Sequence, residues 1–181
     1  MNLRSLLFVV LVGLVFAGLT AVVVRYALRT RRSSQATWEE ILARLAHLDR
    51  EKIAAIALDA IDDSGRQNFM LEPDAIWSML GGMEGLELLE KNCQVLIELT
   101  TYVQRWHPEA LVVAEQLRLN AREIEWHVGR LKGAASTGNL QSAFADYAQR
   151  AAATYYLMTR HVLELYEQVS FPELAQLKQA I

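Results

Sequence analysis

Residues and motifs that support covalent chemistry are scarce in this chain of 181 residues. Cys93 is the only cysteine, which excludes a disulfide within the chain, and we expect it to be a small buried apolar residue. The sequence contains no Gly-x-Ser-x-Gly, no phosphate loop and no Cys/His/Asn set. No Gly-rich active-site loop lies near any of the four histidines. These absences predict a protein without catalytic activity.

Positive charge is scarce in most of the chain. Beyond Arg32 the sequence has 13 basic and 21 acidic residues, a net charge of −8. Binding to nucleic acid needs a basic face, and no basic stripe with interleaved aromatic residues is present. We therefore expect no nucleic-acid partner. The other five basic residues flank one uncharged run: Arg4, Arg25, Arg29, Arg31 and Arg32.

That uncharged run extends from Ser5 to Val24, twenty residues without a charge. A helix of about 20 apolar residues spans a bilayer core of about 30 Å. A secretory signal peptide has a shorter apolar stretch and a small-residue cleavage site, and Leu19-Thr20-Ala21 fits such a site poorly. The run therefore predicts an uncleaved single transmembrane helix, although cleavage of residues 1–24 stays open.

The arginines that follow the run predict its orientation. Arg25, Arg29, Arg31 and Arg32 outnumber Arg4, and positively charged flanks stay on the cytoplasmic side. We expect the N-terminus outside, the C-terminal domain in the cytoplasm and these arginines at the lipid headgroups. The predicted organisation is an anchor with a basic flank at 1–32, a linker at 33–37 and a helical-bundle domain at 38–181.

Apolar residues recur at helical spacing throughout that domain, and its three prolines fall at segment ends. Thr37 and Glu40 fit a capping box, and Pro73 fits the first position of a helix. The fold class predicted is all-α: an antiparallel four-helix bundle with a short C-terminal helix. The helices expected are 38–61, 73–106, 109–133, 140–169 and the short 172–180.

The helix predicted at 73–106 has more apolar surface than one seam needs. Its heptad seam includes Leu86, Leu89, Cys93 and Leu96, and a second set broadens the apolar face: Ile76, Met83, Ile97 and Leu99. Such a helix is either central in its bundle or carries an interface, so this second set is the candidate interaction face. Gly81, Gly82 and Gly85 permit close helix packing or a kink, and we expect close packing.

Metal binding is a possible function, because helical bundles can hold di-iron sites. Those sites need Glu-x-x-His on two helices, and this sequence has none. The nearest arrangements are Glu123 with His127, His161 with Glu164, and His47 with Glu51. We expect no metal and no cofactor, and a metal-binding helical bundle is the third functional alternative.

The segment Arg130-Leu131-Lys132-Gly133-Ala134-Ala135, followed by Gly138-Asn139-Leu140, resembles the segment around the active site of histidine-containing phosphotransfer domains. Those domains are four-helix bundles with a His-x-x-Lys-Gly pattern on a helix before a turn. The resemblance covers residues 130–140 and implies a signalling module. The phosphorylated histidine of the pattern falls on Gly129, and His127 lies two positions earlier, about 200° around a helix.

Three functions therefore follow from the sequence. The first is a membrane-anchored helical-bundle interaction or scaffold protein without catalytic activity, with a protein partner or self-association. The second is a signalling module that resembles phosphotransfer domains but lacks their phosphorylated histidine. The third is the metal-binding bundle.

Overall fold

The computed structural model describes residues 12–13, 18, 20, 36–62 and 71–181. The chain divides into two compact units, Met1–Thr37 and Trp38–Ile181, and each is described by itself. In the first unit, residues 12, 13, 18 and 20 are helical. The rest of the predicted anchor at 1–32 lies outside the described residues, and so do its flanking Arg25, Arg29, Arg31 and Arg32. Among the helices described, none has both the length and the apolar character needed to cross a bilayer.

Helices are the only regular secondary structure in the described part of the second unit, which confirms the all-α prediction. The described residues form seven helices and no strand: α2 (Trp38–Leu42), α3 (Arg50–Asp62), α4 (Pro73–Leu80), α5 (Gly82–Val103), α6 (Ala110–Ser136), α7 (Leu140–Gln168) and α8 (Leu174–Ala180). Pro73 occupies the first turn of α4, as predicted, and the short C-terminal helix is present as α8.

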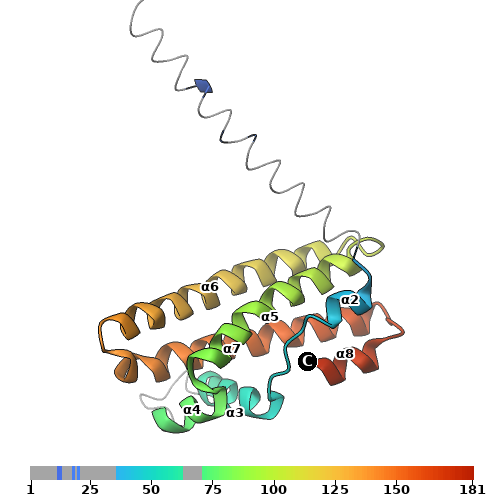
Figure 1. Ribbon diagram of the computed structural model, residues 1–181. Coiled ribbons are helices and arrows are strands. Elements are labelled where there is room, and N and C mark those ends of the chain that lie inside the picture. The colour runs from blue at the N-terminus through green and yellow to red at the C-terminus, as the bar shows by residue number, and fades with distance from the viewer. Residues whose placement is uncertain (1–11, 14–17, 19, 21–35, 63–70) are drawn as a thin grey trace, which may run out of the picture. The chain divides into compact units, whose positions relative to one another are not determined.

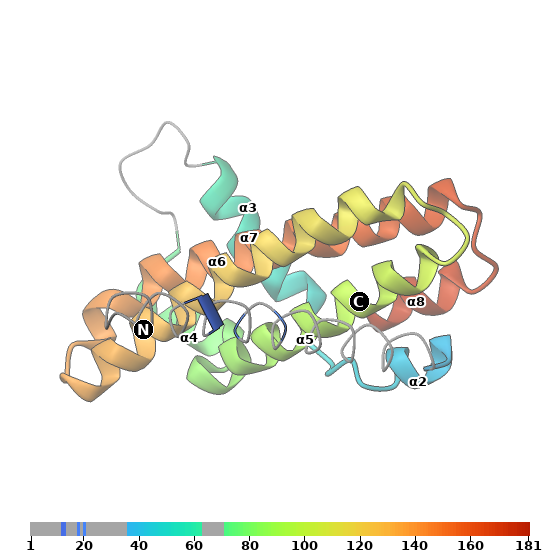
Figure 2. The same cartoon turned by 90° about the horizontal axis from the view of Figure 1, so that it is seen from above.

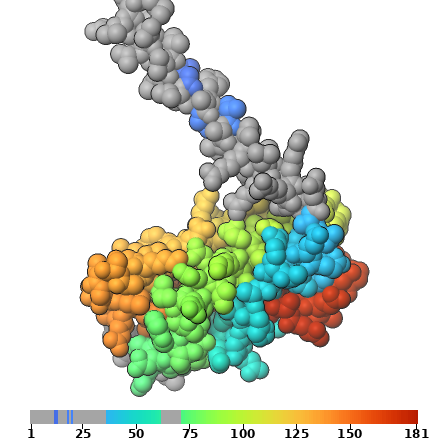
Figure 3. Space-filling view, viewed as in Figure 1, coloured from blue at the N-terminus to red at the C-terminus, as the bar shows by residue number. Residues whose placement is uncertain are grey.

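Three long helices, α5, α6 and α7, form a bundle in which α6 runs antiparallel to both neighbours (Figures 1 and 2). The shorter helices complete it: α2 packs on α5, α3 and α8 pack on α7, and α4 packs on both α5 and α7. Figure 3 shows α2, α4 and the segment between α2 and α3 covering one side of this unit. The helical bundle is confirmed. The prediction of four long helices is not, because the described residues form three long helices, and the shorter helices α2, α3, α4 and α8 take the place of a fourth.

The core consists of the apolar seams expected from the sequence. Leu86, Leu89, Cys93 and Leu96 of α5 are buried. The seam of α6 is buried in full: Ala110, Ala114, Leu117, Ala121, Ile124, Val128 and Leu131. The three alanines allow the neighbouring helices to approach α6 closely. Helical spacing of apolar residues therefore located the packed side of each long helix.

The continuous helix predicted at 38–61 is wrong, because the chain leaves the helical path between α2 and α3. Asn92 of α5 explains this interruption. Its side-chain amide donates to the carbonyl oxygen of Ala46 (2.8 Å), and its Oδ1 accepts from the Ala46 N–H (2.8 Å). The same Nδ2 also donates to the Tyr155 hydroxyl (3.2 Å). At the start of α3, Asp49 Oδ1 accepts from the Lys52 N–H (3.2 Å), which is an N-cap interaction.

The continuous helix predicted at 73–106 is also wrong, and so is the expectation that its glycines serve close packing between helices. Gly81 and Gly82 have φ values of +76° and +66°, in the left-handed region, where they end α4 and begin α5. A Cβ on Gly85 would lie 1.6 Å from the carbonyl oxygen of Leu80. The three glycines therefore form a kink.

Substitution of Gly85 tests whether the kink requires glycine. Because the Leu80 backbone occupies the Cβ position, we expect Gly85→Ala to lower the free energy of unfolding by about 1–3 kcal/mol. Gly129→Ala is the matched control, since a Cβ there meets nothing within 4 Å. The control should stabilise the protein by about 0.5–1 kcal/mol. Urea denaturation followed by tryptophan fluorescence measures both, and equal effects would contradict the described geometry.

Substitution of Asn92 tests whether its amide holds the 43–49 segment. We expect Asn92→Ala to lower the free energy of unfolding by about 1–3 kcal/mol, because it leaves both backbone groups of Ala46 without their buried partner. Hydrogen exchange at the Ala46 amide should accelerate. The control is Asn120→Ala, which removes a half-exposed amide of α6 that accepts only from Gln116 one turn away among the described residues, and it should change stability by less than about 0.5 kcal/mol. Unchanged exchange at Ala46 in the Asn92 variant would refute the role of this side chain.

Candidate functional site

The four residues predicted to form an interaction face do not form an exposed surface. Ile76, Ile97 and Leu99 are buried and Met83 is half-buried. The structure does not bring these four residues together on one exposed helix, because α4 and α5 separate at Gly81. Helix α5 packs against α2, α4, α6 and α7, so its second apolar side is covered within the chain. Of the two explanations for its excess apolar surface, the structure supports a central position.

The three most exposed large apolar side chains of the described residues lie instead on α6. Val112 is 73% exposed, Leu119 58% and Trp126 56%. These residues are seven apart, so they lie in line along one side of the helix, and we call them the α6 stripe. The described contacts of α6 are with α5 and α7, which cover the opposite side. Our sequence analysis missed this stripe, although its seven-residue spacing was a readable signal.

Charged residues border the α6 stripe. Arg118 forms an ion pair with Glu115 one turn away. Arg122 forms no ion pair with any residue that the structure describes. The Arg130 guanidinium lies 5.9 Å from the ring centroids of both Trp126 and Tyr147. An apolar line with charged edges is typical of a helix that binds another helix.

A buried imidazole lies beside the stripe, between α6 and α7. His127 is only 4% exposed, and its ring centroid is 5.0 Å from that of Trp126 and 5.7 Å from that of Tyr147. Its Nε2 lies 3.7 Å from Glu123 Oε1, and its buried Nδ1 has no hydrogen-bond partner among the described residues. Burial lowers the pKa of His127, and Arg150 lowers it further, while Glu123 and Asp146 oppose this effect.

The segment that resembles phosphotransfer domains serves the helical hairpin in this structure. Lys132 Nζ lies 3.2 Å from Glu87 Oε1 and 3.7 Å from Glu90 Oε2, so it links α6 to α5. Gly129 is exposed on α6 and has no side chain to accept a phosphoryl group. His127 is covered by Trp126 and Tyr147, out of reach of a phosphodonor. These residues give the phosphotransfer alternative no support.

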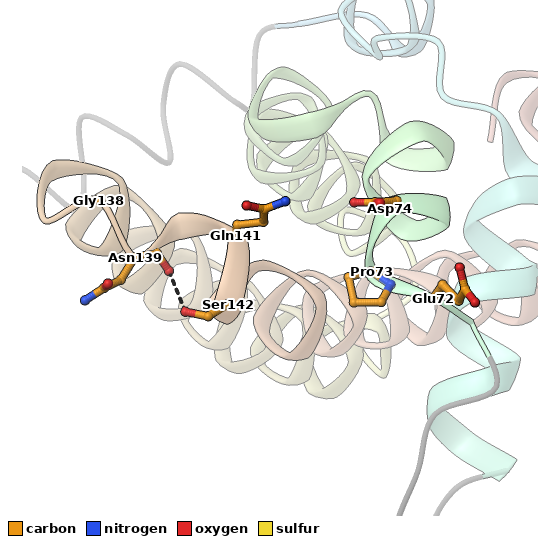
Figure 4. A pocket seen from close by; sticks show the side chains of 7 residues that line it. All are labelled: Glu72, Pro73, Asp74, Gly138, Asn139, Gln141 and Ser142. Carbon is orange, nitrogen blue, oxygen red and sulfur yellow. Dashed lines mark hydrogen bonds between the residues drawn. The ribbon is translucent and has the colours of Figure 1, made fainter.

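An open hollow lies between the start of α4 and the α6–α7 turn (Figure 4). Its described lining is Glu72, Pro73, Asp74, Gly138, Asn139, Gln141 and Ser142. The Ser142 hydroxyl donates to the carbonyl oxygen of Asn139 (3.0 Å). Glu72 and Asp74 are the carboxylates of this lining, and neither forms a described hydrogen bond with Ser142. The serine of this hollow is therefore not paired with a base.

The histidines and the cysteine do not form a reactive centre in the part of the chain that the structure describes. No three His, Cys, Asp or Glu residues there are close enough together to hold a metal ion. Cys93 is buried and donates to the carbonyl oxygen of Leu89 (3.1 Å). Burial raises the pKa of its thiol to about 12, so it is a poor nucleophile at neutral pH.

The buried imidazole predicts a pH dependence of stability. Because burial lowers the pKa of His127, the unfolded chain binds this proton more readily, and stability should fall as the pH decreases below about 6.5. One proton gives a slope of at most about 1.4 kcal/mol per pH unit. Urea denaturation between pH 8 and 5 should show a smaller loss for His127→Gln than for the unmodified chain. His47→Gln, which removes an exposed imidazole, should keep the original profile. Identical profiles for all three proteins would contradict the prediction.

Comparison of the chain with family models, with curated proteins and with solved structures gives no match.

Proposed function

We propose that this chain is a membrane-anchored helical-bundle interaction protein without catalytic activity. Residues 5–24 form the anchor, the N-terminus lies outside, and the helical unit 38–181 works in the cytoplasm. That unit binds a protein partner through the α6 stripe. The observation that carries the proposal is the line of exposed apolar side chains on a helix whose other side is packed.

Solvation energetics support a docking role for the stripe. Exposed apolar side chains are common singly, but three that recur about every 10.5 Å along one side of a helix can contact one partner together, and their removal from water is favourable. Tryptophan is enriched where proteins bind one another, because it buries a large area with few rotatable bonds. Trp126 is held against His127 and Tyr147, so little further ordering is needed when a partner covers it.

Sequence features support the tether. Twenty uncharged residues are enough to span a bilayer, and four arginines follow within eight positions. The linker 33–37 is short, so the helical unit stays close to the bilayer. Tethering raises the effective concentration of any partner at the same membrane, which allows a surface of modest area to bind usefully.

Topology reporters test the tether and its orientation. A reporter active only in the cytoplasm, fused after Ile181, should be active, and one active only outside should be silent. The chain should remain in the membrane fraction after alkaline extraction and retain residues 1–24 by mass. Replacement of Arg25, Arg29, Arg31 and Arg32 by glutamine should reduce the cytoplasmic signal, because Arg4 then outweighs the other flank.

The matched control replaces Arg44, Arg105, Arg150 and Arg160 by glutamine, which removes the same charge from the helical unit and should leave the topology unchanged. A reporter active only outside, or a chain extracted into the soluble fraction, would refute the proposed tether.

A further inference from the structure

We infer that the partner of the α6 stripe is a second copy of this chain, whose α6 lies antiparallel across the stripe about a two-fold axis at Leu119. The inference rests on the proposed docking function and specifies its partner. Symmetric pairing through one self-complementary surface is the commonest form of protein association.

The order of side chains along the stripe favours an antiparallel copy. Val112 and Trp126 lie seven residues on either side of Leu119. A two-fold axis at Leu119 therefore places the two Leu119 side chains together and places Val112 against Trp126 of the second copy, twice. Each end then pairs a small side chain with a large one, which keeps the helices evenly spaced. A parallel copy would pair tryptophan with tryptophan at one end and valine with valine at the other.

The charges along one edge of the stripe fit the same arrangement. Glu115 and Arg122 lie on the same edge of α6, because seven residues make almost two full turns. In an antiparallel pair the same edge of each helix faces its equivalent in the other copy. Glu115, which pairs with Arg118 in its own chain, therefore also meets Arg122 of the second copy on both sides of the axis. Arg122 has no ion-pair partner among the described residues of its own chain. The second copy provides one.

The charge of α6 differs from that of the rest of the unit. Helix α6 has four basic and three acidic residues, whereas the sequence after Arg32 has a net charge of −8. Two acidic units repel each other, and this repulsion is smaller where α6 faces α6 than where α5 faces α5, because α5 has four acidic residues and one basic residue. The charge distribution therefore favours contact between copies through this helix.

Cysteine cross-linking of the full chain in membranes tests the register. At an axis separation of about 10 Å, facing Cα atoms lie about 5 Å apart, within the range that a disulfide spans. Leu119→Cys should therefore form a covalent dimer on mild oxidation. Val112→Cys and Trp126→Cys should not link to themselves, because the equivalent positions are about 21 Å apart. The two variants expressed together should form a mixed dimer.

Two controls accompany the cross-linking. The unmodified chain should remain monomeric on a non-reducing gel, since its Cys93 is buried. Leu157→Cys introduces a thiol at an exposed apolar position of α7 and should link several-fold less than Leu119→Cys.

Three results would overturn the inference. Self-linking at all three stripe positions would mean a parallel pair. Linkage of Leu119→Cys to a different protein would show that this protein, and not a second copy, is the partner, and the docking function would still hold. No linkage at any stripe position would contradict the docking function as well, while the topology reporters would still test the tether independently.

Charge reversal gives a second test that leaves the core untouched. Glu115→Arg and Arg122→Glu each place like charges together in the dimer, so each should reduce cross-linking at Leu119→Cys several-fold. The double variant restores opposite charges and should recover most of the linkage. Equal losses in the single and double variants would contradict the Glu115–Arg122 pairing.

Discussion

The architecture of this protein depends on one buried amide. Asn92 offers a donor and an acceptor to the backbone of Ala46, so the chain can leave the helical path inside the protein without losing hydrogen bonds. Without that partner, two backbone groups of the half-buried Ala46 would lose their hydrogen bonds, which favours a continuous helix. Tyr155 anchors the same amide to α7, so one side chain connects three segments of the chain.

This interruption decides which surface remains for a partner. Because the chain turns between α2 and α3, α2 packs on α5 and α3 packs on α7. The Gly81–Gly82 break places α4 against both α5 and α7. The short helices thus pack on α5 and α7, and α6 is left with two neighbours. Its third side carries Val112, Leu119 and Trp126, which stay largely exposed although the Trp126 ring also contacts Tyr147 of α7.

Several polar side chains of the bundle connect neighbouring helices. Lys132 links α6 to α5, Gln149 of α7 donates to Asp59 of α3 (2.7 Å), and the Tyr166 hydroxyl donates to the carbonyl oxygen of Leu99 (3.0 Å). Each group bonds to a neighbouring helix instead of facing a cavity. A bundle whose polar groups fix its packing, and whose apolar line faces outward, is suited to binding through its surface.

The sequence by itself determined the all-α class, the packed seams of α5, α6 and α7, and the turns that follow Val103 and Ser136. Those features depend on apolar spacing, on glycine and on proline, all of which act within a few residues. It did not determine the breaks at 43–49 and Gly81, since the first depends on an amide 46 residues away and glycines alone permit either packing or a kink. Nor did it distinguish Ile76, Ile97 and Leu99, which are buried, from Val112 and Leu119, which are exposed. Both sets recur at helical spacing, and only the tertiary structure decides which apolar face another helix covers, because burial depends on contacts between segments distant in the chain.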